Sequence, residues 1–276
     1  DTGSEDSDDD IDIIATSNAK IITDTSIDDD PLVPIPAPTL PSTLIGEIIT
    51  YRIDLDVPAG AVLPNLQALD VLDHGLAFVG CLNIEGGTLT TTLPGGFDDA
   101  CNDPINPLIQ AEPAGNTSAS DQGRQIIFSL GDVINPSDTE DEILSIYYQV
   151  IVLNIPENVD GVDGLKNQVI WTWDGGSLEA SAPPIEIIEP KLGITKEADP
   201  TTTLLYHTIT FTISIAHTPE SSVDAYDVEF VDVIPYGLQY VDGSVFTSGL
   251  PPTSITYTPG SKTLSAFWDV FPLGQN

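Results

Sequence analysis

Carboxylates gathered in short runs are the residues of this chain best suited to chemistry. One run opens the chain, one precedes a proline-rich stretch, and one surrounds a cysteine. Ca²⁺ is a hard cation that binds several carboxylate oxygens at once, so these runs predict calcium sites. The other interpretation is loop charge in solvent, because the first run lacks the glycine and the final glutamate of an EF-hand loop. The candidate ligands are Asp6, Asp8, Asp10, Asp28, Asp29, Asp30, Asp98, Asp99 and Asp103.

The net charge limits the partners that the chain can have. Seven lysines and arginines stand against 43 aspartates and glutamates, which gives a formal charge of −36. Such a field repels nucleic acid and anionic membrane surfaces and attracts cations. It fits calcium binding, and it fits solubility in salty surroundings, where ions screen the repulsion between like charges. Because of this negative charge we expect no nucleic-acid partner. No apolar run is long enough to span a bilayer, so we also expect no direct membrane insertion.

Catalytic motifs are not found. The sequence has no GxSxG nucleophile elbow. Its three histidines, His74, His207 and His217, are scattered without the spacing of a metal site. A pair of carboxylates for glycoside hydrolysis would be uninformative among so many acids. The sequence therefore predicts a protein that is not an enzyme.

The two cysteines, Cys81 and Cys101, enclose a glycine- and threonine-rich loop. No second cysteine or histidine lies close enough to suggest a metal site, so the choice is between a disulfide and two buried thiols. We favour the disulfide, which fits an oxidising compartment and would contribute about 3 kcal/mol by closing the loop. Asn116 begins an Asn-Thr-Ser sequon and is a candidate glycosylation site.

Strand signals fill most of the chain. Valine, isoleucine and threonine are abundant, glycine and proline recur, and the segment from Leu44 alternates between apolar and polar residues. We expect an all-β protein in three parts. Residues 1–41 form an acidic segment with a possible donor strand and a proline-rich linker, 42–182 a first domain with an insertion around 81–123, and 183–276 a second domain.

The second domain repeats the first. Residues 46–80 align with 206–243, so that Tyr51 meets Phe211 and Asp70 meets Asp232. Lys20 in "NAKIITDT" corresponds to Lys196 in "GITKEADP", and 126–138 corresponds to 264–276. The first domain continues into two more strand-like stretches that the second does not reach, so the second copy is incomplete here. We expect either that the natural chain continues past residue 276 or that another chain supplies those strands.

The segments "ITKEADP", "TITFTISI" and "VEFVDVIPYGLQYVDGS" resemble the DUF11-type repeat of bacterial and archaeal cell-surface proteins. The resemblance covers 190–276 well and 20–180 more loosely. It implies tandem immunoglobulin-like β-sandwiches on an extracellular protein. Some relatives of this architecture carry an internal lysine–asparagine isopeptide bond with a buried carboxyl beside it. By that resemblance the candidates here are Lys20, Asn167 and Asp70, unless these are an ordinary surface lysine and a turn asparagine.

The expected function is a structural module of a stalk, sheath or filament on the cell surface. Calcium would stabilise it, its partners would be neighbouring copies or modules, and assembly would proceed by strand complementation, in which a strand of one chain completes the sheet of its neighbour. The alternative is an adhesin or carbohydrate-binding module, with the 81–123 insertion contacting a glycan or another host-surface ligand.

Overall fold

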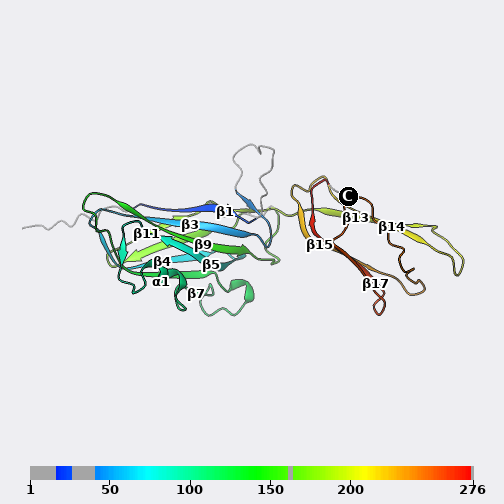
Figure 1. The fold of residues 1–276 in the computed structure, drawn as a ribbon, viewed down its shortest axis with the longest axis horizontal. Helices are drawn as coiled ribbons and strands as arrows, with labels where there is room; N and C mark the ends of the chain where they lie inside the picture. Colours follow the sequence, from blue (N-terminus) through cyan, green and yellow to red (C-terminus); the bar gives the residue numbers. More distant parts are fainter. Residues whose placement is uncertain (1–16, 27–40, 161–163, 275–276) are drawn as a thin grey trace, which may run out of the picture. The chain divides into compact units, whose positions relative to one another are not determined.

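The computed structural model describes residues 17–26, 41–160 and 164–274, and it is built almost entirely of strands. The chain divides into two compact units, residues 1–187 and 188–276. Within the described residues, no helix is long and apolar enough to cross a membrane. The predicted all-β class, with two units of β-sheet in tandem, is confirmed (Figure 1).

The first unit is a sandwich of two main sheets. One sheet has four antiparallel strands in the order β1 (Asn18–Thr25), β3 (Ile48–Val57), β9 (Glu142–Val152) and β5 (Leu76–Glu85). The other has the order β11 (Gly176–Ser181), β10 (Asn167–Trp173), β4 (Val62–Leu72), β8 (Gln125–Ile134) and β6 (Thr90–Thr91), with β7 (Leu108–Gln110) also paired to β8. A short parallel pair joins β2 (Ser42–Thr43) to β12 (Glu186–Ile187).

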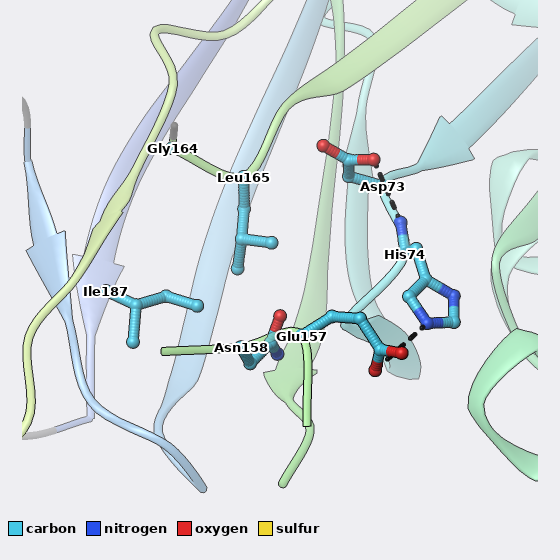
Figure 2. A pocket seen from close by; sticks show the side chains of 7 residues that line it. All are labelled: Asp73, His74, Glu157, Asn158, Gly164, Leu165 and Ile187. Carbon is cyan, nitrogen blue, oxygen red and sulfur yellow. Dashed lines mark hydrogen bonds and ion pairs between the residues drawn. The ribbon is translucent and has the colours of Figure 1, made fainter. Parts of the chain in front are cut away.

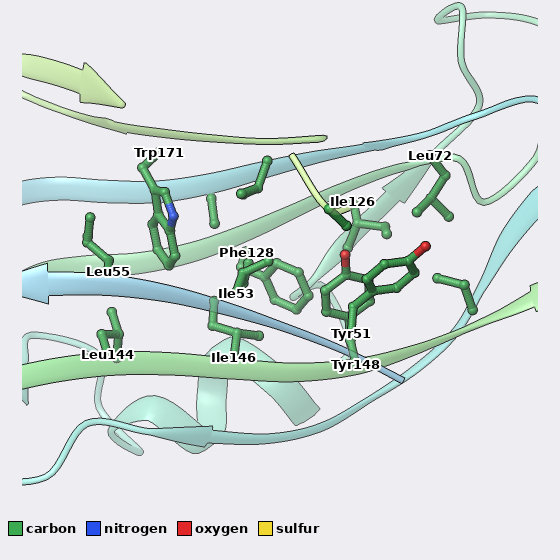
Figure 3. Packing of buried hydrophobic residues seen from close by; sticks show 14 of the residues in the cluster. Tyr51, Ile53, Leu55, Leu72, Ile126, Phe128, Leu144, Ile146, Tyr148 and Trp171 are labelled. Carbon is green, nitrogen blue, oxygen red and sulfur yellow. The ribbon is translucent and has the colours of Figure 1, made fainter. Parts of the chain in front are cut away.

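Alternation along the strands fills the space between these sheets. In β3 the inward residues Tyr51, Ile53 and Leu55 are fully buried, as the period of two requires. Trp171, Phe128 and Tyr148 pack among them from the other strands (Figure 3). The Tyr51 and Tyr148 rings are stacked with centroids 5.8 Å apart. This core fixes which face of each strand turns inward, and therefore where the polar residues among them must lie.

The insertion is built into the sandwich, because it contributes β6 and β7 to the second sheet and buries Leu89 and Ala100 in the core. Cys81 of β5 is joined to Cys101 of α1 (Phe97–Asn102) by a disulfide, as predicted. No helix was expected, because six residues are too few to show a helical period. A single 3₁₀ turn, η1 (Ala119–Asp121), follows later in the insertion.

The second unit consists of two smaller sheets. One pairs β13 (Leu192–Asp199) with β14 (Thr210–His217). The other has the order β15 (Ala225–Val233), β17 (Thr263–Phe271) and β16 (Ser254–Thr258). Its buried apolar core, as far as the described residues show it, consists of Ala225, Ala266, Trp268 and Phe271.

The N-terminal strand differs from expectation. The stretch proposed as a donor strand contains β1, and β1 pairs with β3 of its own unit from Asn18↔Leu55 to Thr25↔Ile49. It therefore belongs to the first sandwich and is not a separate arm. The first unit also extends beyond the expected boundary at 182, because the short strand β12 pairs with β2.

Candidate functional site

A buried polar cluster lies inside the apolar core of the first unit. It consists of Lys20, Asp70, Asn167 and the hydroxyl of Tyr148. Lys20 is 3% exposed, Asn167 1% and Asp70 0%. Burying a charged pair is costly unless its members pair and hydrogen-bond, so such a cluster in an apolar core calls for an explanation.

The four residues come from both sheets. Lys20 lies opposite Ile53 in the β1–β3 register, on the edge strand of one sheet. Asp70 is on β4 of the facing sheet, between Ile126 of β8 and Val169 of β10. Asn167 is the first residue of β10. The inward period of each strand thus directs residues from the start, middle and end of the unit to one point.

Hydrogen bonds connect the cluster into a ring. Lys20 Nζ donates to Asp70 Oδ2 and, at 2.6 Å, to Asn167 Oδ1. Asn167 Nδ2 donates to the Tyr148 hydroxyl at 3.0 Å, and that hydroxyl donates to Asp70 Oδ2 at 2.8 Å. Asp70 Oδ1 is buried and has no hydrogen-bond partner among the described residues. The lysine amine therefore lies against the amide it could attack, and the Asp70 carboxyl contacts the amine directly and is linked to the amide through the Tyr148 hydroxyl.

Burial favours the neutral forms of both ionisable partners. Burial lowers the pKa of Lys20 to about 8, although the charge of Asp70 and the hydrogen bond that Lys20 donates to it partly oppose the shift. Burial likewise raises the pKa of Asp70, against the opposing effect of Lys20. The pKa of Tyr148 is raised well above its ordinary value by burial and by the charge of Asp70, so its hydroxyl keeps its proton. A neutral amine is a nucleophile and a neutral carboxyl is a proton donor.

The rings around the lysine shield it from water. Lys20 Nζ lies 5.2 Å from the centroid of the Tyr51 ring and 5.5 Å from that of Tyr148. Aromatic faces attract the ammonium form and place apolar surface around it. The resemblance to surface-protein repeats pointed to Lys20, Asp70 and Asn167, and the structure brings all three together. The resemblance did not point to Tyr148, which the alternation in "LSIYYQVIV" places on the inward face of β9.

The calcium candidates lie elsewhere. Asp6, Asp8, Asp10, Asp28, Asp29 and Asp30 lie outside the described residues. Asp98 accepts from the Asn102 side chain, Asp99 from the Gly95 amide and Asp103 from the Ile105 amide. Across 17–26, 41–160 and 164–274, no three acidic, histidine or cysteine side chains are grouped closely enough to hold a metal ion. Calcium binding stays a prediction.

Melting in different salts tests that prediction. If the acidic runs bind calcium, Ca²⁺ at about one hundred times its Kd should stabilise the protein by roughly 2.7 kcal/mol. The melting temperature should then be higher in Ca²⁺ than in EDTA, in Mg²⁺ or in NaCl of equal ionic strength. The triple variant Asp98→Asn, Asp99→Asn, Asp103→Asn separates this run from the others. Equal increases in all salts would instead mean that the ions only screen charge.

The sequon asparagine is partly engaged within the protein. Asn116 Nδ2, the atom to which a glycan would be attached, donates to Asp121, and Oδ1 accepts from the Ser118 amide at 2.9 Å. Glycosylation at Asn116 is not tested by these contacts and stays a prediction.

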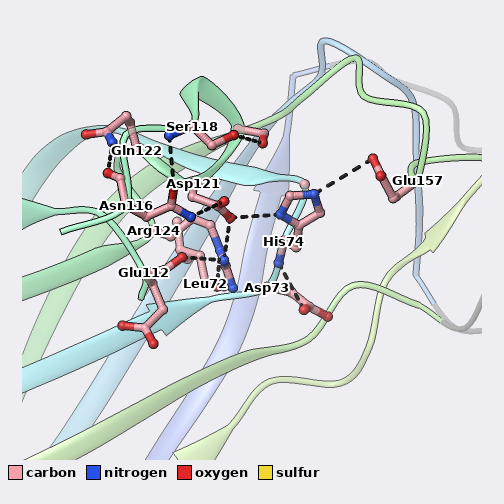
Figure 4. A network of polar contacts seen from close by, with 12 residues as sticks. Leu72, Asp73, His74, Glu112, Asn116, Ser118, Asp121, Gln122, Arg124 and Glu157 are labelled. Atoms are coloured by element: carbon pink, nitrogen blue, oxygen red, sulfur yellow. Dashed lines mark hydrogen bonds and ion pairs between the residues drawn. The ribbon is translucent and has the colours of Figure 1, made fainter. Parts of the chain in front are cut away.

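A second polar network fastens the insertion to the sandwich (Figure 4). His74 Nδ1 lies 2.9 Å from Asp121 Oδ1, and Arg124 Nη1 lies 2.7 Å from the same oxygen. The hydrogen bond with His74, followed by that from Arg124, lowers the pKa of Asp121. Arg124 also donates to the carbonyls of Leu72 and Glu112. His74, Asp121 and Arg124 thus use their side chains in hydrogen bonds and ion pairs that connect the insertion to the sandwich.

A hollow of about 170 Å³ lies beside His74 (Figure 2). Its polar lining includes Asp73, Glu157 and Asn158. The Asn158 amide donates to the carbonyls of Gly75 and Leu153, and Asp73 accepts from the backbone of His74 and Lys166. The hollow is small, and Asn158 and Asp73 already hydrogen-bond to backbone groups of the fold. It is therefore not a strong candidate for a binding site.

No family model matches the chain, and no curated protein matches it. The resemblance to the DUF11-type repeat is therefore not confirmed. Solved structures similar to this chain include the major pilin SpaD of Corynebacterium diphtheriae, at 14% identity and a TM-score of 0.34, covering 93% of this chain and 49% of the pilin. The pilus backbone of Streptococcus pneumoniae is 13% identical with a TM-score of 0.32, covering 75% of this chain and 48% of that one.

The collagen adhesin of Staphylococcus aureus is 11% identical with a TM-score of 0.27, covering 74% of this chain and 52% of the adhesin. The chain thus spans about half the length of each of these three proteins. Likenesses at such identities and TM-scores are too distant to carry a functional argument. The function must be argued from the residues themselves.

Proposed function

We propose that this chain is a structural segment of an extracellular surface protein, and that its first β-sandwich locks itself with an amide bond between Lys20 and Asn167. The observation that carries the proposal is the contact between Lys20 Nζ and the side-chain amide of Asn167 beside the buried carboxyl of Asp70. A fold needs no buried lysine at this point, since an apolar residue would pack there at lower cost.

The reaction needs no reagent from outside. The neutral Lys20 amine attacks Cγ of Asn167, so a bond forms from Nζ to Cγ. Asp70, which carries the proton of the neutral pair, gives that proton to Nδ2 through the hydroxyl of Tyr148, which hydrogen-bonds to both groups, and then takes one from Nζ. The Cγ–Nδ2 bond then breaks and ammonia leaves. Amine and primary amide become secondary amide and ammonia, and Asp70 ends as it began.

Proximity provides much of the rate. The fold holds nucleophile, amide and proton carrier in contact and keeps water out, which converts a slow bimolecular reaction into a step within one molecule. The bond would link residues 147 positions apart in the sequence, from the first strand of the unit to its tenth. Tension applied to the chain outside those two residues would then pass through the amide and bypass the strands enclosed between them, which suits a segment of a stalk or filament.

Intact mass tests the proposal directly. The folded chain should weigh one ammonia less than its sequence with the disulfide formed. Digestion should yield a branched peptide that joins Lys20 to Asn167. Asn167→Ala should restore the full mass, whereas the matched control Lys196→Arg should keep the loss. A wild-type chain at full mass after prolonged folding would exclude the bond and with it this proposal.

Bond formation should follow a bell-shaped pH profile. In the reactive state the Lys20 amine is neutral and Asp70 is protonated, so the pair carries one titrating proton. Above about pH 8 the pair loses that proton, because burial lowers the pKa of Lys20 to about 8, and none remains for the leaving nitrogen. At low pH the pair gains a second proton and the amine becomes an ammonium. This acid limb should lie above the ordinary aspartate range, because burial raises the pKa of Asp70.

The profile can be measured on chain recovered unfolded from inclusion bodies. The protein is refolded at a series of pH values, quenched in denaturant, and the fraction that has lost ammonia is read from the mass. A rate that keeps increasing up to the ordinary lysine pKa of about 10.4 would contradict the shared proton.

A further inference from the structure

The second unit contains a matching lysine and aspartate. Lys196 Nζ lies 2.6 Å from Asp232 Oδ1. Lys196 lies opposite Ile213 in the β13–β14 register, as Lys20 lies opposite Ile53. Its ammonium lies 4.7 Å from the centroid of the Phe211 ring, two residues before Ile213, as Tyr51 stands two before Ile53.

The aspartates occupy matching places as well. Asp232 of β15 pairs with Leu264 of β17, and Asp70 of β4 pairs with Ile126 of β8. The alignment of the two repeats matches Leu264 to Ile126. The strand pairing thus reproduces, in each sheet of the second unit, the register that places lysine and aspartate in contact in the first.

The two pairs differ in what covers them. The side chains of Lys20 and Asp70 are 0% exposed, whereas those of Lys196 and Asp232 are 38% and 16% exposed. In the first unit the cover consists of β9, which pairs with β3, and β10, which pairs with β4. Among the described residues of the second unit, β14 pairs only with β13, and β15 pairs only with β17. One edge of each strand is therefore open.

The inward face beside these edges is apolar and accessible. Phe211 is 39% exposed, whereas its counterpart Tyr51 is fully buried. Ile213 and Phe230 are half-buried, whereas their counterparts Ile53 and Ala68 are fully buried. Open strand edges beside an uncovered apolar face favour the addition of further strands.

We propose that Lys196 and Asp232 form a covalent docking site for a partner segment of two β-strands, one of which carries an asparagine. This inference rests on the proposed function of the first unit. One strand of the segment lies antiparallel on the open edge of β14, as β9 lies on β3. The other lies antiparallel on β15 and places its asparagine opposite Ile234, because Asn167 lies opposite Leu72, two residues after Asp70.

The chemistry is the same condensation. The Lys196 amine attacks the side-chain amide carbon of the incoming asparagine, Asp232 carries the proton to the leaving nitrogen, and ammonia departs as the new amide forms. The partner strands supply both the amide and the burial that the pair needs. Covering Lys196 with apolar strands would favour its neutral, nucleophilic form, as burial does for Lys20.

A peptide spanning residues 142–181 of this chain is the probe, because it contains β9, β10 and β11 and completes such a centre in the first unit. The folded chain is mixed with an excess of this peptide and analysed by mass spectrometry. The expected adduct has the mass of chain plus peptide less one ammonia, and digestion should join Lys196 to Asn167 of the peptide. Lys196→Arg, or Asn167→Ala in the peptide, should abolish it. Asp232→Asn should slow it roughly 100-fold or more.

The mass of the chain alone, taken from the same samples, reports on the first unit. A chain at full mass would mean that the Lys20–Asn167 bond is absent and that the proposed function fails. A chain that has lost its own ammonia but forms no adduct would overturn the docking site alone. Binding of the peptide without an adduct, or an adduct that persists in Lys196→Arg, would equally overturn it.

Discussion

Replacing Asp70 with asparagine is expected to slow formation of the Lys20–Asn167 bond by roughly 100- to 10,000-fold, the usual contribution of a general acid–base group. Asp70 touches the amine directly and reaches the leaving nitrogen through Tyr148. The variant has almost the same shape and keeps hydrogen-bonding atoms at both ends. Refolding followed by timed intact-mass measurement gives the rate, and circular dichroism reports whether the sandwich has formed.

Tyr148→Phe separates proton relay from packing. The variant keeps the ring that packs against Tyr51 and Phe128 but removes the hydroxyl between Asp70 and Asn167. It should fold and form the bond more slowly than wild type, with a changed pH profile. If the hydroxyl only stabilises the fold, the melting temperature would fall while the rate of bond formation and its pH profile stayed the same.

For Asp70 the contrary outcome is equally plain. If Asp70→Asn formed the bond as fast as wild type, the catalytic role of Asp70 would be wrong.

Local pattern predicted the fold well where one face of a strand is buried. The alternation around Tyr51, Ile53 and Leu55 predicted β3 and its inward face, and the structure buries these three residues completely. The pairing partner of a strand was harder to predict. "NAKIITDT" has strand character, but only its contacts with β3 show that it completes the first sandwich. Pairing depends on residues far away in the sequence, and a single strand does not contain that information.

The candidate site shows the same division between local and distant information. The two repeats made Lys20 and Asp70 visible, because each has a counterpart in the second copy. Asn167 has no counterpart among the described residues and was named only through a resemblance. Tyr148 looked like any inward aromatic, since its neighbours explain its burial without its hydroxyl. The acidic runs attracted attention by charge alone, yet Asp98, Asp99 and Asp103 each hydrogen-bond to nearby groups of the insertion.

Removing the amide bond is expected to lower the free energy of unfolding of the first unit by about 5 kcal/mol. The bond would close a loop between residues 147 positions apart, and the chain-entropy relation for cross-links gives this value for such a loop. Asn167→Ala should therefore lower the melting temperature by roughly 10–20 °C, at 2–4 °C per kcal/mol for a unit of this size. Thermal and denaturant unfolding of wild type and variant, followed by near-ultraviolet circular dichroism, measure the difference.

Two comparisons isolate the bond from the side chain. Asn167→Ala also removes hydrogen bonds to Lys20 and Tyr148, worth about 1 kcal/mol each, so its loss includes a packing part. Asp70→Asn, measured before its slow reaction has formed the bond, retains the Asn167 side chain and should show most of the same loss. Gln168→Ala, one residue further along β10 and half-buried, should change stability little. The contrary result would be an Asp70→Asn variant that mass spectrometry shows to be unlinked but that has the same melting temperature as wild type. Lys20 and Asn167 would then stabilise the core by contact alone, and the cross-link would have no mechanical role.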